Sequence, residues 1–221
     1  MVGFSKEWEA VYRAGAQLSS WPWTDVVSLV MRHARPVRPG LRVLELGPGA
    51  GANIPFLLSL GFDYYGIEGS PAAVGLLHEQ FPKLRSQIVQ GDFSKNLVFD
   101  SSFDLVLDRA SLTCNSTDSI SHTISCLKEI IVPNGKFIGI DWYSTEHSSF
   151  SLDSGVIDSF TKTNMNSGQF VGLGAIHFST EAHLKELFAG FNFLSLEHVK
   201  KIQLIGSHSE TRAAFNFVVE K

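Results

Sequence analysis

Short apolar runs alternate with amphipathic stretches from residue 41 onward, and this alternation organises most of the chain. Continuous apolar runs predict strands over residues 41–46, 62–67, 86–90, 103–107 and 136–140. Between them, helical spacing predicts helices over about 53–59, after Ser70-Pro71, and over 118–131. Strands that alternate with helices in this way predict a parallel sheet covered by helices on both faces.

The first 40 residues do not follow this alternation. They predict two short helices, with Ser5 capping the first and Pro22 in the first turn of the second. Trp21 and Trp23 lie between the two helices, where they could form a lid over a ligand or pack a helix onto the core. The sequence leaves that choice open.

The last third of the chain differs again. A Ser/Gly-rich stretch over 143–178 predicts one helix near 152–162, and a second helix follows over 179–189. Two strands, at about 193–199 and 212–219, are joined by a turn around Gly206, so they are expected to pair antiparallel.

Composition narrows the class of protein. The chain has 221 residues, of which 44% are hydrophobic and 18% charged, and we expect one folded domain over 1–221. A net charge of −4 without a basic stripe predicts no nucleic-acid partner. We expect no membrane partner either, because no apolar segment approaches the ~20 residues of a span. The N-terminus lacks a signal-peptide pattern, and Cys114 and Cys126 fit reduced thiols, so we expect a cytoplasmic protein.

A glycine-rich turn carries the strongest chemical signal. It reads Glu45-Leu46-Gly47-Pro48-Gly49-Ala50-Gly51 and lies between an apolar strand and a helix. Glycines allow a tight turn and close approach of the backbone to a ligand, and the helix N-terminus offers free N–H groups. The string also fits the dinucleotide form G-x-G-x-x-A. However, the Glu45 carboxylate suits a cationic ligand group and would repel a pyrophosphate.

Acidic residues end the next strands at the same edge of the predicted sheet. Glu68 can accept both hydroxyls of a ribose, and it is followed by Gly69. Asp92 can accept from an exocyclic amine while Phe93 offers its face to a ring. The fourth strand ends in the charged pair Asp108-Arg109.

Taken in order, the motifs VLELGPGAG, GIEGS, QGDF, FDLVLDR and VPNGKFIGIDW resemble a class I S-adenosylmethionine-dependent methyltransferase. The resemblance covers residues 41–142, which it identifies as the cofactor-binding core. It implies an α/β fold with a Rossmann-like, doubly wound, seven-stranded and mostly parallel sheet whose C-terminal strand is antiparallel. Residues 1–40 would be an N-terminal helical cap, 143–178 a substrate-covering insertion, and 179–221 a C-terminal helix and strand pair.

The resemblance also implies a role for each motif residue. The glycines Gly47, Gly49 and Gly51 would line the methionine part of the cofactor, with Glu45 near its amino group. Glu68 and Gly69 would hold the ribose, and Asp92 with Phe93 the adenine. Asp108, followed by Arg109, would lie beneath the methyl donor and is a candidate catalytic residue.

Acceptor recognition is expected where the fifth strand ends and the insertion begins. We expect Trp142, Tyr143, His147 and His177 to line the acceptor site. His147 and His177 are candidate general bases, because histidine titrates nearest to neutral pH, and we prefer His177. Both could instead be structural. Asp108 and Asp141 could in principle share a Mg²⁺, but no further carboxylate or Asn follows Asp141 directly, so we expect no metal.

The sequence therefore predicts methyl transfer from S-adenosylmethionine to an oxygen or nitrogen of a small-molecule acceptor. Residues 108–111 read Asp-Arg-Ala-Ser rather than the Asn/Asp-Pro-Pro-Tyr/Phe of enzymes that methylate amino groups of DNA and of protein glutamine. By this Asp-Arg pair, the chain resembles the small-molecule branch of the family, which contains thiopurine and tellurite methyltransferases. A non-catalytic S-adenosylmethionine-binding regulatory protein and an NAD-type oxidoreductase remain alternatives. Oligomeric state and acceptor identity are not indicated.

Overall fold

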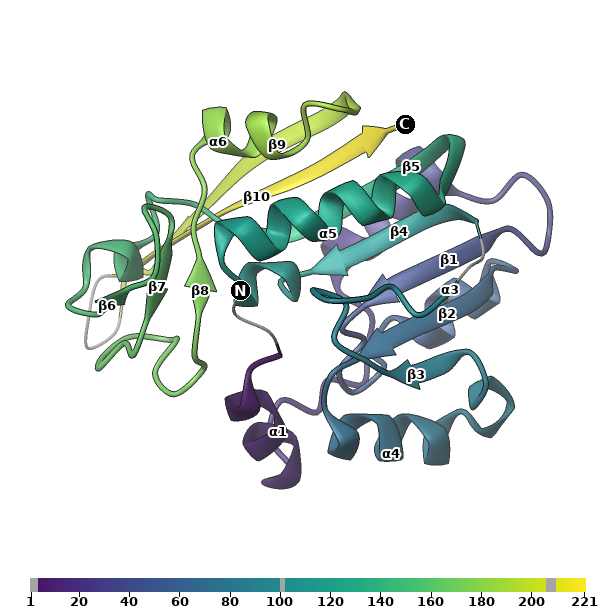
Figure 1. The fold of residues 1–221 in the computed structure, drawn as a ribbon, viewed down its shortest axis with the longest axis horizontal. Helices are drawn as coiled ribbons and strands as arrows, with labels where there is room; N and C mark the ends of the chain where they lie inside the picture. The colour runs from purple at the N-terminus through teal and green to yellow at the C-terminus, as the bar shows by residue number, and fades with distance from the viewer. Residues whose placement is uncertain (1–3, 100–101, 206–209) are drawn as a thin grey trace.

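A seven-stranded sheet forms the centre of the molecule in the computed structural model, which describes residues 4–99, 102–205 and 210–221 (Figure 1). Its order is β3-β2-β1-β4-β5-β10-β9. The first five strands run parallel, and β10 runs antiparallel to both of its neighbours. The predicted fold class is therefore confirmed. The strands are β1 (Arg42–Leu46), β2 (Asp63–Glu68), β3 (Ile88–Gln90), β4 (Phe103–Arg109), β5 (Ile131–Tyr143), β9 (Asn192–Ile202) and β10 (Thr211–Glu220).

Helices cover both faces of this sheet, because alternate strand residues are apolar on either side. On β1, Val43 packs into one buried cluster while Leu44 and Leu46 pack into the other. The helices α5 (Thr117–Ile130) and α6 (Glu181–Leu187) cover the Leu44 face. The Val43 face is covered by α2 (Thr24–Leu29), which one π turn (Val30–Ala34) extends, α3 (Ile54–Ser59) and α4 (Pro71–Gln80).

Local capping explains several helix starts. The Ser70 hydroxyl accepts a hydrogen bond from Ala73 N at 3.1 Å, with Pro71 at the first helical position, as the sequence predicts. The N-terminal helix α1 (Lys6–Arg13) begins after Ser5, but the Ser5 hydroxyl donates to Glu7 and does not cap the helix. Pro22 precedes α2, whose N-cap is Trp23, so its predicted place in the first turn is wrong.

The helix predicted near 152–162 is also wrong. A 3₁₀ turn (Ser148–Ser151) precedes this segment. The strands β6 (Gly155–Val156) and β7 (Thr161–Thr163) take the place of the helix and form a small sheet with β8 (Ile176–His177). Asp158 explains the difference, because its carboxylate accepts from Phe160 N at 2.9 Å and closes a turn between β6 and β7. The turn expected around Gly206 lies outside the described residues.

Asp158 also ties this small sheet to the core. Its carboxylate accepts from Thr117 N and from the Thr117 hydroxyl, both at 2.9 Å, at the first turn of α5. A negative charge there satisfies an otherwise free N–H and complements the helix dipole. Within the described part of the chain, no helix is long and apolar enough to span a membrane.

Replacing Asp158 should therefore loosen the insertion without disturbing the main sheet. We expect Asp158→Ala to lower the free energy of unfolding by ~1–2 kcal/mol, the usual effect of losing a helix-capping side chain. Urea denaturation followed by circular dichroism measures this change. Asp153→Ala, in an exposed carboxylate five residues earlier, is the matched control. Equal stability of the two variants would contradict the capping role.

Candidate functional site

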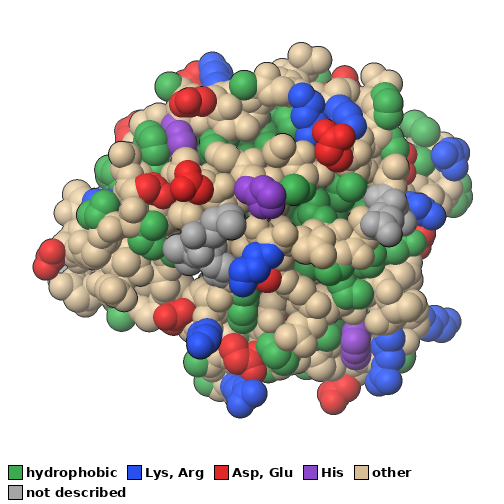
Figure 2. All heavy atoms as spheres, viewed as in Figure 1, with side chains coloured by type: hydrophobic (Ala, Val, Ile, Leu, Met, Phe, Trp, Pro, Cys, Tyr) green, Lys and Arg blue, Asp and Glu red, His purple; other side chains and the backbone are tan. Residues whose placement is uncertain are grey.

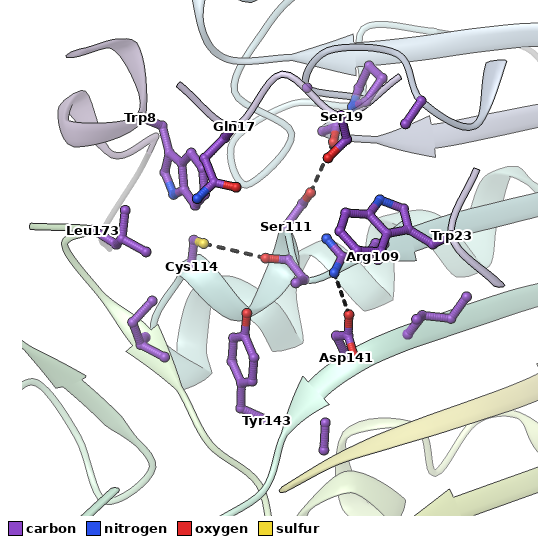
Figure 3. Close-up of a pocket in the computed structure, with 18 of the residues that line it drawn as sticks. Trp8, Gln17, Ser19, Trp23, Arg109, Ser111, Cys114, Asp141, Tyr143 and Leu173 are labelled. Atoms are coloured by element: carbon purple, nitrogen blue, oxygen red, sulfur yellow. Dashed lines mark hydrogen bonds and ion pairs between the residues drawn. The ribbon is translucent and has the colours of Figure 1, made fainter. Parts of the chain in front are cut away.

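A cavity of about 680 Å³ opens at the carboxyl ends of the parallel strands (Figure 3). Ligands collect at this edge in doubly wound sheets, where the strand order reverses between β1 and β4. The ends of β1 to β5 form its floor, while α1, α2 and the segment 143–178 contribute to its walls. One continuous space therefore joins the side of the sheet that carries β2 and β3 to the side that carries β5 and β10.

The glycine turn brings backbone to the wall of this cavity. Gly47 and Gly49 line it and have φ angles of 64° and 57°. A Cβ at Gly49 would lie 2.5 Å from the Tyr12 hydroxyl, and one at Gly47 would collide with Ser111. Gly51 differs, because it does not line the cavity and its Cβ would press against Leu77. The structure thus places Gly51 in helix packing, whereas the sequence predicts a place beside the ligand.

Two buried carboxylates lie beside the turn. Glu45 accepts from Asn53 Nδ2 at 2.8 Å and from the Tyr64 hydroxyl at 2.7 Å. Glu68 accepts from Gly49 N at 3.0 Å and from Ser70 N at 2.8 Å, so it holds the turn against the end of β2. Burial raises the pKa of both carboxyls, and these hydrogen bonds oppose the rise. Both residues line the cavity, as does Gly69.

Asp92 and Phe93 line the cavity at the end of β3. The Asp92 carboxylate accepts from Ser94 and from Phe4 N, the latter at 2.9 Å, and Lys95 pairs with it. Partial burial raises the pKa of Asp92, but hydrogen bonds from Ser94, Phe4 and Lys95 outweigh burial and lower it. Sequence reasoning missed Phe4, because no local pattern predicts a contact across 88 residues.

Asp108 and Trp142 support the cavity from behind, and neither lines it. Asp108 is fully buried and accepts from Leu112 N at 2.9 Å and from Trp142 Nε1 at 2.7 Å. Burial raises its pKa to about 7. The Trp142 ring packs in the core against Phe188 and Phe217. The expectation that Trp142 lines the acceptor site is corrected, because its side chain occupies the opposite face of β5 from its neighbours.

His177, the base preferred from sequence, also lies off the cavity. It is fully buried between the Thr161 hydroxyl, 3.0 Å from Nδ1, and the Ser179 hydroxyl, 3.2 Å from Nε2. Burial lowers its pKa to about 3, so the ring stays neutral. The expected place at the pocket wall is therefore corrected. The apolar residues around His177 hold it inside the small sheet, where it joins β7 to β8.

Tyr143 and His147 do line the cavity, in an aromatic wall with Phe170. The Tyr143 and Phe170 ring centroids are 4.6 Å apart, and those of His147 and Phe170 are 5.2 Å apart. Burial lowers the pKa of His147. Its Nδ1 accepts a hydrogen bond from Ser149 N at 3.1 Å. Because a backbone N–H can only donate, the neutral ring carries its proton on Nε2.

Arg109 lines the cavity beside Trp23 and Asp141 (Figure 3). Its guanidinium lies 3.5 Å from the Trp23 ring centroid and 2.6 Å from an Asp141 oxygen. Trp23 thus forms part of the cavity, whereas Trp21 is 84% exposed and does not line it. Ala110 and Asp141, at the ends of β4 and β5, both have positive φ angles, 57° and 56°. Among the described residues, no group of three His, Cys, Asp or Glu side chains could hold a metal ion.

The chain is similar in sequence and in fold to known methyltransferases. The methyltransferase domain family model matches residues 44–139. The solved structure of TehB from Haemophilus influenzae has a TM-score of 0.65 and 17% identity, covering 96% of this chain and 67% of that one. An S-adenosylmethionine-dependent methyltransferase from Methanosarcina mazei has a TM-score of 0.67 and 16% identity, covering 91% of this chain and 98% of that one.

Curated relatives match over shorter segments. The ribosomal RNA small subunit methyltransferase A of Porphyromonas gingivalis is 47% identical over 53 residues, 24% of this chain and 20% of that protein. Its namesake from Thermosynechococcus vestitus is 34% identical over 95 residues, 43% of this chain and 32% of that protein. The chain thus spans about a fifth to a third of the length of these relatives.

The two glycines of the turn provide a matched test of the site. We expect Gly49→Ala to weaken binding of S-adenosylhomocysteine at least ~10-fold, since its φ angle and Tyr12 leave no room for a methyl group. Gly51→Ala should instead lower the melting temperature and leave the affinity of the folded protein within ~3-fold, because it faces Leu77. Calorimetric titration and thermal unfolding measure the two effects. The reverse pattern would assign the ligand contact to Gly51.

Proposed function

We propose that this chain, whose residues 44–139 form a class I S-adenosylmethionine-dependent methyltransferase domain, transfers a methyl group to an oxygen or nitrogen of a small-molecule acceptor. S-adenosylmethionine is the cofactor of this domain.

The residues around the turn suit the cofactor. Glu45 offers a buried anion for the amino group of its methionine part, and Gly47 and Gly49 allow its close approach. Glu68 accepts hydrogen bonds from two backbone N–H groups. Its carboxylate keeps further lone pairs that can accept from the ribose hydroxyls. Asp92 and Phe93 lie further along the same edge, just after the end of β3, where they would meet the adenine. When bound, S-adenosylmethionine supplies a methyl group on a sulfonium, a leaving group that is already activated.

The continuity of the cavity is the observation that carries the proposal. Its volume of about 680 Å³ falls within the ~300–1,000 Å³ of small-molecule sites. The space reaches from Asp92 on the cofactor side to Tyr143 and His147 on the other side. The Ser5 hydroxyl contacts the Leu173 carbonyl at 3.4 Å, so the residues just before α1 meet the insertion at the cavity. A cavity that holds both molecules side by side aligns donor and acceptor.

Charge distribution supports a small acceptor over a nucleic acid. The net charge is −4, and on the face in Figure 2 basic and acidic side chains are interspersed. Nucleic-acid binders concentrate Lys and Arg on one surface to neutralise phosphates. The relatives named for ribosomal RNA match only part of this chain, so their substrate does not carry over. The free thiols Cys114 and Cys126 support a reducing, cytoplasmic location.

Consumption of S-adenosylmethionine tests the proposal. We expect the protein to bind S-adenosylmethionine and to release S-adenosylhomocysteine when a panel of small metabolites is supplied. Binding without turnover on any acceptor would favour the non-catalytic regulatory protein. Binding of NAD in preference to S-adenosylmethionine would instead favour the oxidoreductase.

The Glu68 carboxylate offers a sharper test of the cofactor's orientation. We expect Glu68→Ala to weaken S-adenosylmethionine binding by ~1–3 kcal/mol, because hydrogen bonds from the ribose and from the glycine turn are lost together. Isothermal titration calorimetry measures the change. Glu79→Ala, at an exposed carboxylate on α4, is the control and should bind as the unmodified protein does. Unchanged affinity in Glu68→Ala would remove Glu68 from the cofactor site.

A further inference from the structure

Two residues that line the cavity near the ends of β4 and β5 carry buried hydrogen-bond donors that have no acceptor among the described residues. His147 Nε2 and Arg109 Nε are both buried, and neither has a hydrogen-bond partner within the described ranges 4–99, 102–205 and 210–221. Both residues line the cavity, from the start of the insertion and from the end of β4. Buried donors without acceptors are rare in native proteins, because each forfeits the hydrogen bond that it would make with water.

The proton on His147 is fixed by its neighbour. Because Ser149 N donates to Nδ1, the Nε2 atom of the neutral ring is a donor and cannot accept a proton. Burial lowers the pKa of His147, which keeps the ring neutral near pH 7. Its role as a general base, expected from sequence, is therefore replaced by that of a hydrogen-bond donor.

Two further titratable side chains that line the cavity, Cys114 and Tyr143, hold their protons. Burial raises the pKa of the Cys114 thiol to about 12 and also raises the pKa of the Tyr143 hydroxyl, so both keep their protons. Asp141 is paired with Arg109 at 2.6 Å. Lys201 and Arg212, from β9 and β10, add positive charge, with Glu210 beside Arg212. Tyr12 of α1 and Asp25 of α2 are further titratable residues that line the cavity.

From these contacts we propose that the methyl acceptor is a small carboxylate with an apolar body, held by His147 and Arg109. This inference rests on the proposed function and names its substrate class. N–H donors favour oxygen over sulfur, which is a weak acceptor, and a guanidinium edge matches the plane of a carboxylate. The rings of Tyr143 and Phe170, with Leu173, offer apolar surface for the rest of the molecule.

The transfer then balances without a base. A lone pair of the carboxylate oxygen forms a bond to the methyl carbon, and the carbon–sulfur bond breaks with its electron pair staying on sulfur. The negative charge of the acceptor and the positive charge of the sulfonium cancel, so the products are a methyl ester and a neutral thioether. No proton moves, so the step needs no general base.

Binding of simple probes to the complex with S-adenosylhomocysteine tests this inference. We expect benzoate to bind at least ~10-fold more tightly than benzamide or benzylamine, the range for hydrogen bonds to a charged group. These two probes keep the ring and replace the anion by a neutral and a cationic group. Isothermal titration calorimetry measures all three affinities, and chromatography detects methyl benzoate when S-adenosylmethionine replaces the product.

Substitution of His147 locates the carboxylate. In His147→Asn the side-chain oxygen can still accept from Ser149 N, while the donor at Nε2 is lost. We expect it to reduce the preference for benzoate over benzamide to within ~3-fold and to leave S-adenosylhomocysteine affinity unchanged. His122→Asn, at an exposed histidine on α5, is the control and should keep the full preference.

Each contrary result has a distinct meaning. Equal binding of the three probes, absence of benzoate binding, or preference for benzylamine overturns the carboxylate inference. Methyl transfer to phenols with an acidic limb of the pH–rate profile that disappears in Asp141→Asn also overturns it, because it identifies a base in the protein. Failure to bind S-adenosylmethionine or S-adenosylhomocysteine contradicts the proposed function itself, and this is measured before any probe is added.

Discussion

The buried carboxylate of Asp108 is the constraint on which the acceptor side of the cavity depends. It accepts the Leu112 N–H and the Trp142 indole N–H, so it joins the end of β4 to the end of β5. Because strand side chains alternate, drawing Trp142 into the core turns its neighbours Asp141 and Tyr143 to the cavity. A buried carboxyl group is tolerated only when hydrogen-bond partners surround it, and these contacts satisfy that condition.

The N-terminal segment connects the two halves of the site. The Glu9 carboxylate accepts from the Ser70 hydroxyl and from Ala72 N, at the start of α4. Phe4 contacts Asp92 on the cofactor side, and Ser5 contacts Leu173 of the insertion. The N-terminal segment that ends in α1 therefore touches the elements expected to bind cofactor and the segment expected to cover the acceptor, so the two regions share a wall.

Sequence reasoning succeeded where a local pattern specifies the structure. The acids Glu68 and Asp92 follow apolar strands, and parallel strands bring their carboxyl ends to one edge, so their shared cavity could be predicted. His177 could not be placed in this way, because its surroundings come from Thr161 and Ser179, in a small sheet that no periodic pattern marks. The helix expected near 152–162 failed for a related reason, since the Asp158 turn depends partly on Thr117 from another part of the chain.

At the ends of β4 and β5 the backbone adopts a conformation that costs stability but positions the charged groups of the site. Ala110 and Asp141 adopt positive φ angles that side chains other than glycine rarely take, and such residues each cost ~1–3 kcal/mol. Glycine at Asp141 would relieve that strain but remove the carboxylate that holds Arg109. A homologue selected only for thermal tolerance would be free to make the exchange, whereas one selected for turnover would not. The aspartate at position 141 thus lowers the stability of the fold and keeps the Arg109 guanidinium aligned.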